Sequence, residues 1–326
     1  MKDKIYKTNS IVEAGILCVF MLICMLLNSY VPFFGFVGLI LLPIIIAILY
    51  VRHDLKVTIV ALAASFLLIM FSTGVVTAIS FILLYTLSGI ILGYCIKKRV
   101  AGSISLFFVA IAFSIGVISF FFLVSKFIYK EGIYDLINQI ITIYKNQTEE
   151  MIMHYKQMGI NTQNINQLKS MVESLNVNLV LSVLPGYVIN CCVIFTFLIY
   201  KLAVNIFGKL RMNINNIKPF KEWHIDDRLT GIIIGITCIG IILNAKNVII
   251  GQYIINSSII VGSFIFSIVG ISAIIFLFRG KYKVSKIAIG LMIVLVIMLG
   301  MIRIFPMIGI IDSIINFRRF SLNKKV

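Results

Sequence analysis

The sequence predicts an all-α fold, a polytopic transmembrane bundle of about eight to nine helices with an amphipathic helical hairpin on the extracytoplasmic side. Of the 326 residues, 60% are hydrophobic and only 13% are charged, and the mean hydropathy is +1.08. Soluble domains typically contain about 45–50% apolar and about 25% charged residues. The apolar residues also form long runs that contain almost no charge. Together these observations indicate a chain that is solvated by lipid.

The apolar runs have the length of membrane-spanning helices. A helix needs about 20 apolar residues to cross the hydrocarbon core, and continuous runs favour helices over the alternating pattern of a barrel. Nine runs approach this length. They cover residues 11–31, 36–51, 57–73, 75–96, 104–124, 179–200, 229–243, a part of 248–278, and 287–303.

Positive charge predicts the orientation of the chain. The net charge is +17, and most of the 29 basic residues lie in connectors that share one side of the membrane with the N-terminus. By the positive-inside rule, we expect a cytoplasmic N-terminus in a bacterial cytoplasmic (inner) membrane, with the lipid bilayer as partner and no nucleic acid. Nine spans would leave the basic C-terminus outside. Either residues 306–317 fold back through the membrane, or the chain has eight spans with both ends inside.

The long connector 126–178 is the predicted amphipathic hairpin. Its apolar residues recur at gaps of three and four, as amphipathic helices require. With one break, they are Ile133, Leu136, Ile140, Tyr144, Met151, Tyr155, Met158, Ile165, Leu168, Val172 and Leu175. Residues 159–162 (Gly-Ile-Asn-Thr) predict a turn between two helices. Two interpretations stay open: a cap packed on the bundle, or a lid or docking element for a partner.

Catalytic chemistry has no clear signature in the sequence. Ionisable groups inside a membrane are costly and usually mark functional sites, but the spans contain very few of them. His53, His154 and His224 lie far apart in connectors, and no Cys/His cluster has metal-ligand spacing. We therefore expect no catalytic residue, no metal and no cofactor, and a protein that is not an enzyme.

Neutral polar residues in the spans are the candidate ligand-binding groups. Asn28 lies near the outer end of the first run, Thr77 and Tyr85 lie in the fourth, and Tyr187 and Asn190 follow Pro185 in the sixth. A proline inside a helix bends it, and residues near a bend can face a cavity. We expect these residues either to line an outward-facing pocket for a small neutral ligand or to form interhelical hydrogen bonds.

Two segments suit the membrane interface. Trp223 is the single tryptophan and precedes the seventh run, and tryptophan prefers the interface. Residues 309–319 combine apolar positions with the terminal Arg318 and Arg319, as expected of a helix lying on or dipping into the interface. We therefore interpret Trp223, Arg318 and Arg319 as interface anchors.

These two segments also carry a family resemblance. They read Pro-Phe-Lys-Glu-Trp at 219–223 and Gly-Ile-Ile-Asp-Ser-Ile-Ile-Asn-Phe-Arg-Arg at 309–319. With these motifs, and with its order of spans around a long outer connector, the chain resembles the YybS-like family of bacterial membrane proteins, which carries domain of unknown function 2232.

In layout, the first six spans resemble the S components of energy-coupling-factor transporters, the substrate-binding membrane subunits for vitamins and similar micronutrients. S components typically meet their coupling subunit through an Ala-x-x-x-Ala surface on the first helix, and the corresponding stretch here is residues 14–18, Ala-Gly-Ile-Leu-Cys. The resemblance implies a six-span bundle at 1–205 that includes the insertion 126–178. A basic connector at 206–228 and a C-terminal extension at 229–326 would follow, and the extension is foreign to an ordinary S component.

Two functions remain as hypotheses. The first is a multi-pass membrane protein that binds a small solute or takes part in its transport, with energy-coupling subunits as partners. The alternative is a membrane scaffold or assembly factor that acts through its outer hairpin and its basic cytoplasmic connector.

Overall fold

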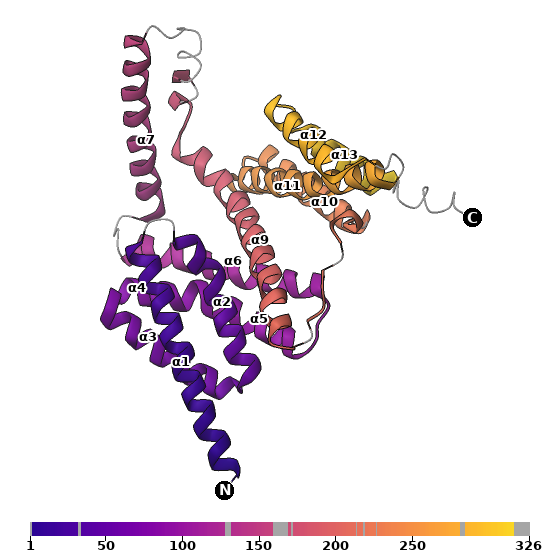
Figure 1. Cartoon of the computed structure of the whole chain (residues 1–326). Helices are drawn as coiled ribbons and strands as arrows, with labels where there is room; N and C mark the ends of the chain where they lie inside the picture. Colours follow the sequence, from indigo (N-terminus) through magenta and orange to yellow (C-terminus); the bar gives the residue numbers. More distant parts are fainter. Residues whose placement is uncertain are drawn as a thin grey trace, which may run out of the picture. The chain divides into compact units, whose positions relative to one another are not determined.

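The computed structural model describes residues 2–31, 34–127, 132–158, 169–170, 172–212, 214–217, 219–225, 227–280 and 284–315. Within these ranges every regular element is a helix, which confirms the all-α prediction (Figure 1). The elements are α1 (Lys2–Tyr30), α2 (Gly35–Arg52), α3 (Leu55–Thr73), α4 (Val75–Ser80), η1 (Phe81–Thr86), α5 (Leu87–Lys97), α6 (Gly102–Phe127), α7 (Gly132–Gln157), α9 (Val177–Lys209), η2 (Phe220–Glu222), α10 (Asp227–Ala245), α11 (Ile249–Gly280), α12 (Lys286–Met298) and α13 (Ile304–Ile315).

The membrane-spanning helices match the first eight predicted runs. Among the described residues, eight helical stretches are long and apolar enough to cross a bilayer. One of them, Val75–Lys97, is continuous through α4, η1 and α5. The chain is therefore a polytopic helical membrane protein, because its apolar surface needs a lipid solvent.

The predicted ninth span at 287–303 is wrong in length. Its helix α12 has 13 residues and ends at Met298, so it is about 20 Å long and falls short of a hydrocarbon core of about 30 Å. Gly300 then adopts a positive φ of 72°, which glycine allows at little cost. The 12-residue α13 follows and packs against α11. Two short apolar helices favour a pair that enters and leaves the membrane on the same side. In this arrangement α13 is the segment that folds back.

The chain divides into two units within which the helices pack. Unit 1 comprises Met1–Ile133 and Cys191–Ile217, and unit 2 comprises Tyr134–Asn190 and Lys218–Val326. This division differs from the expected boundaries at 205 and 228, because the insertion groups with the C-terminal helices. Two contacts explain the grouping: Ile137 and Ile141 of α7 pack with Val177 at the start of α9, and Asn256 of α11 donates a hydrogen bond to Ser182 of α9 at 2.8 Å.

Unit 1 is held together by close helix crossings. Gly89 and Gly93 of α5 lie against α2, where a Cβ added at Gly89 would come within 2.7 Å of the Ile46 Cβ. Small residues four apart let two helix backbones approach closely in a membrane. The core beside this crossing contains the fully buried Met25, Leu42 and Phe81.

In unit 2, glycines also allow close backbone contact, here between α11 and α13. A Cβ on Gly270 would collide with the carbonyl oxygen of Phe305, and a Cβ on Gly309 would collide with that of Phe266. The two backbones therefore lie in direct contact, which dispersion forces favour in lipid. As a result α13 is an integral part of the packed unit.

Helix α7 is amphipathic as predicted, but the predicted packing face is wrong. The buried positions include Ile137, Ile141 and Ile152, which are 4%, 7% and 7% exposed. Ile140 and Tyr144 of the predicted stripe are instead 57% and 53% exposed. Apolar residues occupy more than one face of this helix, so periodicity alone could not choose between them. The predicted turn at 159–162 lies outside the described residues.

Candidate functional site

A pocket in unit 1 contains two of the predicted ligand-binding residues. It is lined by Asn28, Gly35, Phe36, Leu39 and Tyr85 and has a volume of about 350 Å³. Small-molecule sites typically measure about 300–1,000 Å³ and combine apolar walls with a few polar groups. This pocket has that composition, since one amide and one phenol face three apolar or glycine positions.

Asn28 owes its place to the glycines that begin α2. It lies near the end of α1, and α2 starts at Gly35 after a short connection. A Cβ on Gly35 would lie 3.2 Å from the Asn28 Oδ1, and a Cβ on Gly38 would lie 3.4 Å from the same oxygen. The glycines therefore make room for a side-chain amide, which offers two donor hydrogens and an acceptor oxygen.

Tyr85 lies in a π-helical turn, the element η1. Such turns are rare and are frequently found at functional sites. The Tyr85 side chain is 2% exposed and lines the same pocket as Asn28. In the same turn, the Leu83 carbonyl oxygen presses against Gly116 of α6, where an added Cβ would collide with it. The widened turn therefore fits only because residue 116 is glycine.

An aromatic contact supports the wall of the pocket. Phe36 stacks on Phe195 of α9, with ring centroids 6.2 Å apart and planes 10° from parallel. Offset ring pairs at this distance are favourable. The contact fixes Phe36 beside Asn28, so the polar groups of the pocket face a rigid apolar surface.

The remaining predicted ligand-binding residues lie elsewhere. Thr77 donates a hydrogen bond to the Thr73 carbonyl oxygen at 2.8 Å and is not among the residues that line the pocket. Tyr187 and Asn190 belong to unit 2. Tyr187 is 59% exposed, and the Asn190 amide donates to the Ile260 carbonyl oxygen at 3.2 Å. The structure thus brings Asn28 and Tyr85 together, whereas Asn190 forms the alternative interhelical bond.

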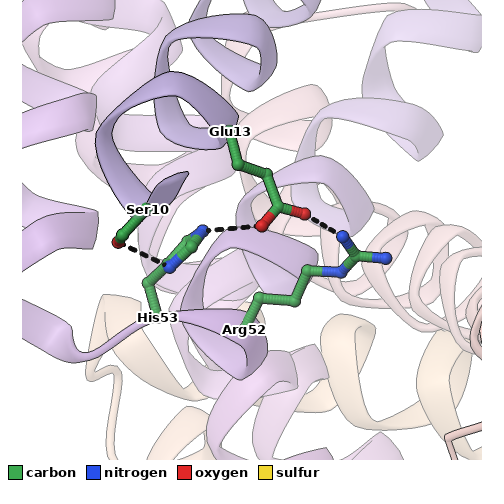
Figure 2. A network of polar contacts seen from close by, with 4 residues as sticks. All are labelled: Ser10, Glu13, Arg52 and His53. Carbon is green, nitrogen blue, oxygen red and sulfur yellow. Dashed lines mark hydrogen bonds and ion pairs between the residues drawn. The ribbon is translucent and has the colours of Figure 1, made fainter. Parts of the chain in front are cut away.

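A charged network in unit 1 joins the N-terminal part of α1 to the end of α2. Figure 2 shows Ser10 and Glu13 facing Arg52 and His53. Glu13 forms an ion pair with Arg52, and its second carboxylate oxygen lies 3.4 Å from the His53 Nε2. The Ser10 Oγ lies 2.8 Å from the His53 Nδ1. A neutral imidazole with its proton on Nε2 is compatible with both contacts, because Ser10 then donates to Nδ1 and the Nε2 proton faces Glu13.

The surroundings of His53 favour its neutral form. Its side chain is 8% exposed. Burial lowers the pKa of His53 below its ordinary value of 6.5, the Arg52 guanidinium lowers it further, and Asp54 opposes the change. At neutral pH the network therefore holds one anion and one cation, which balance each other.

Sequence reasoning missed this network because it considered Glu13 and the histidines separately. The sequence nevertheless contains a feature that predicts the network. The first two spans are joined by only a few residues, so they must be antiparallel neighbours. That geometry puts Glu13, at the start of one span, beside Arg52 and His53 at the end of the next.

The predicted anchor Trp223 is fixed to unit 2 through its backbone. The Ser272 hydroxyl of α11 lies 2.6 Å from the Phe220 carbonyl oxygen and 3.0 Å from that of Trp223, and it donates to both. The rings of Phe220 and Trp223 pack with centroids 5.1 Å apart. The other predicted anchors, Arg318 and Arg319, lie outside the described residues.

Next to Trp223, a buried carboxylate connects the two segments that carried the family resemblance. The Asp312 side chain in α13 is fully buried, and its Oδ2 lies 3.7 Å from the Nδ1 of His224. Buried carboxylates are costly without partners. Sequence reasoning did not pair these residues, although each lies within or next to one of the two motifs.

The two small residues at the ends of the stretch that would correspond to the S-component coupling surface, Ala14 and Cys18, pack inside unit 1. Ala14 and Cys18 are 7% and 6% exposed. The Cys18 thiol donates to the Ala61 carbonyl oxygen of α3 at 3.3 Å. These two small side chains therefore serve the packing of α1 on α3.

Comparison with known proteins supports the resemblance to the YybS-like family of membrane proteins. The family model described as "Predicted membrane protein (DUF2232)" matches residues 19–313. The chain is also similar to "Uncharacterized protein YybS" of Bacillus subtilis (strain 168), at 27% identity over 315 residues, which is 96% of this chain and 98% of that protein. No solved structure matches, and the likeness to S components stays a prediction. The chain therefore belongs to the DUF2232 family of predicted membrane proteins.

Proposed function

We propose that the chain is a solute-binding or transport-associated protein of the bacterial cytoplasmic membrane, without enzymatic activity, and that its solute occupies the Asn28–Tyr85 pocket. The observation that carries the proposal is the meeting of an amide and a phenol at a π-helical turn, beside open space of about 350 Å³. Neutral polar groups beside apolar walls are typical of sites that orient a small molecule.

The lining of the pocket restricts the chemistry of the solute. No ionisable carboxylate or amine is among its lining residues, so a charged solute would lose its hydration without gaining a counter-ion. The Asn28 amide and the Tyr85 hydroxyl both donate and accept hydrogen bonds. The proposed solute is therefore small and neutral, with hydroxyl or amide groups at one end and an apolar surface for Phe36 and Leu39.

The proposed orientation exposes this pocket to the outside. With the N-terminus in the cytoplasm, the end of α1 and the start of α2 lie at the outer surface. The distribution of basic residues in the connectors supports this arrangement. Because Ala14 and Cys18 are buried against α3, any energy-coupling subunit would dock on a different surface.

Thermal unfolding of the purified protein in detergent tests the proposal. A panel of neutral metabolites should include at least one compound that raises the unfolding temperature, because a ligand that binds only the folded state stabilises it. The variants Asn28→Leu and Tyr85→Phe should each lose most of this shift. Thr77→Val is the matched control, since Thr77 is also a polar residue of the fourth span but does not line the pocket.

Two outcomes would count against solute binding at this pocket. One is a panel in which no neutral compound raises the unfolding temperature of the wild-type protein. The other is a shift that persists in both pocket variants, or that is lost equally in the Thr77→Val control.

A second function is favoured by the exposed apolar face of α7. Ile140, Ile143 and Tyr144 are 57%, 57% and 53% exposed there, and clustered exposed apolar residues often mark interaction surfaces. A scaffold that docks a membrane-protein partner through α7 would co-purify with it, and the double variant Ile140→Ser with Tyr144→Ser would lose it. Retention of the partner by that variant would contradict the scaffold.

A further inference from the structure

A second pocket, in unit 2, combines an apolar floor with a basic rim. It has a volume of about 350 Å³. Its basic residues are Lys221 of η2, Arg279 in the last turn of α11 and Lys286 in the first turn of α12. Phe220, Ile275 and Ile293 contribute apolar walls.

The position of the pocket along its helices indicates a membrane interface. Arg279 is the last residue of the apolar stretch Ile249–Arg279 that can span a bilayer, and α12 continues from Lys286 as an apolar helix. Lys and Arg at such ends extend toward the headgroups while their stems cover apolar surface. The pocket therefore presents cations at headgroup depth and apolar walls toward the hydrocarbon.

Two of the basic residues of the rim, Arg279 and Lys286, have no counter-charge in the pocket lining. Among the described residues, no carboxylate forms an ion pair with Arg279 or Lys286. Lys221 lies 3.9 Å from the carboxylate of its neighbour Glu222, which does not line the pocket. Arg279 and Lys286 therefore give the rim a positive charge, and a ligand with a negative headgroup complements it.

The wall formed by η2 is held firmly in place. Ser272 of α11 donates hydrogen bonds to the carbonyl oxygens of Phe220 and Trp223. The Nδ1 of the neighbouring His224 lies 3.7 Å from the Oδ2 of the buried Asp312. On the opposite wall, Ile289 is buried with Ile274 and Phe305 in one core cluster. Because these contacts already order the wall, binding a ligand there costs less conformational entropy.

We propose that this pocket binds one anionic phospholipid. Its phosphate lies among Lys221, Arg279 and Lys286, and an acyl chain lies against Ile275 and Ile293. Basic pockets between transmembrane helices are suited to anionic headgroups, and only a membrane lipid matches the cations and the apolar walls together. The proposal is independent of solute binding in unit 1.

The single tryptophan provides a local probe. Trp223 contacts Phe220, which lines the pocket. We suggest reconstituting the full chain in nanodiscs that contain brominated phosphatidylglycerol or brominated phosphatidylcholine at equal mole fraction, and measuring tryptophan quenching. A local preference of about thirtyfold for phosphatidylglycerol is expected from Arg279 and Lys286, at about 1 kcal/mol each. Inorganic phosphate should not displace it, because the acyl contacts are part of the site.

Two kinds of variant remove the site by different means. The triple variant Lys221→Gln, Arg279→Gln, Lys286→Gln removes the basic rim and should abolish the preference. The variant Gly290→Leu keeps every charge but projects a side chain into open space in α12, where an added Cβ meets no atom within 4 Å. It should exclude the acyl chain and reduce the preference.

The matched control is the triple variant Lys98→Gln, Lys201→Gln, Lys209→Gln, which removes the same charge from unit 1 and should keep the preference. Size-exclusion chromatography in detergent identifies any variant that has not folded. If the triple pocket variant does not fold, Gly290→Leu alone tests the proposal. Equal quenching by the two lipids in the wild type overturns the proposal. So does a preference that survives both pocket variants, or one that the unit 1 control also loses.

Discussion

Charged side chains in this protein join residues that are distant in sequence. Glu13 contacts Arg52 and His53 across the α1–α2 pair, and His224 contacts Asp312. Removing one member of such a partly buried contact destabilises the fold, because the other member then stays at least partly buried without its partner. Each contact therefore predicts a measurable consequence of removing or titrating one member.

The first prediction concerns pH and His53. Because the pKa of folded His53 is below the ordinary value of 6.5, the unfolded chain binds the proton more readily. The stabilising effect of neutral His53 is thus complete above about pH 6.5 and is lost as the pH falls through the lower, folded pKa. The unfolding temperature in detergent should fall with acidification in this window, and less so in His53→Gln. Parallel pH profiles for the two proteins would contradict the prediction.

The second prediction concerns Asp312. Asp312→Ala leaves His224 without its carboxylate and creates a cavity, and should reduce the free energy of unfolding by about 3 kcal/mol. Ser313→Ala is the control, because Ser313 is equally buried but, within the part of the chain that the structure describes, its hydroxyl bonds to the Ile310 carbonyl of its own helix alone. This variant should change the free energy of unfolding by less than about 1 kcal/mol. Unfolding in mixed micelles measures the free energy of unfolding of both variants. Similar losses for the two variants would argue against a special role for the Asp312–His224 contact.

Helix packing depends on glycines whose partners the sequence alone does not reveal. The clearest case is Gly116 of α6, which accommodates the Leu83 carbonyl of the π-helical turn. Gly116→Ala should destabilise the protein by about 1–3 kcal/mol through overpacking, and it should also weaken solute binding, since Tyr85 lies in the same turn. Gly15→Ala is the control, because an added Cβ there meets no atom within 4 Å. Equal stability of the two variants in thermal unfolding would contradict this account.

The elements were predictable where one physical signal dominates. Run length and hydropathy locate the first eight spans, because a membrane requires about 20 apolar residues per crossing. The short helices α12 and α13 were merged or misassigned, since the break at Gly300 depends on a local positive φ. The buried face of α7 and the π-helical turn η1 were also missed, because tertiary contacts select them from several similar alternatives.

The candidate site was predictable only in part. Asn28 and Tyr85 were identified as polar residues in apolar runs, and α1, α2 and η1 bring them together. Tyr187 and Asn190 have the same sequence signature but lie in unit 2. Polarity in a span therefore indicates candidates, whereas their grouping depends on helix packing that one sequence does not specify.

At the scale of the whole molecule, the distribution of charge predicts topology. A cytoplasmic N-terminus places α7 outside and the end of α9 inside. On a background without the six native cysteines, a membrane-impermeant maleimide should label Glu150→Cys in intact cells and Lys209→Cys only after permeabilisation. Both replaced residues are exposed. The reverse labelling pattern would contradict the orientation.

The central claim is that the Asn28–Tyr85 pocket holds a small neutral solute, and native mass spectrometry of the protein released from its own membrane tests it most directly. The wild-type protein is expected to carry a non-covalent adduct of one small molecule, and the double variant Asn28→Leu with Tyr85→Phe should have lost it. An adduct of the same mass and abundance on both proteins, or a wild-type protein without any adduct, would contradict the claim.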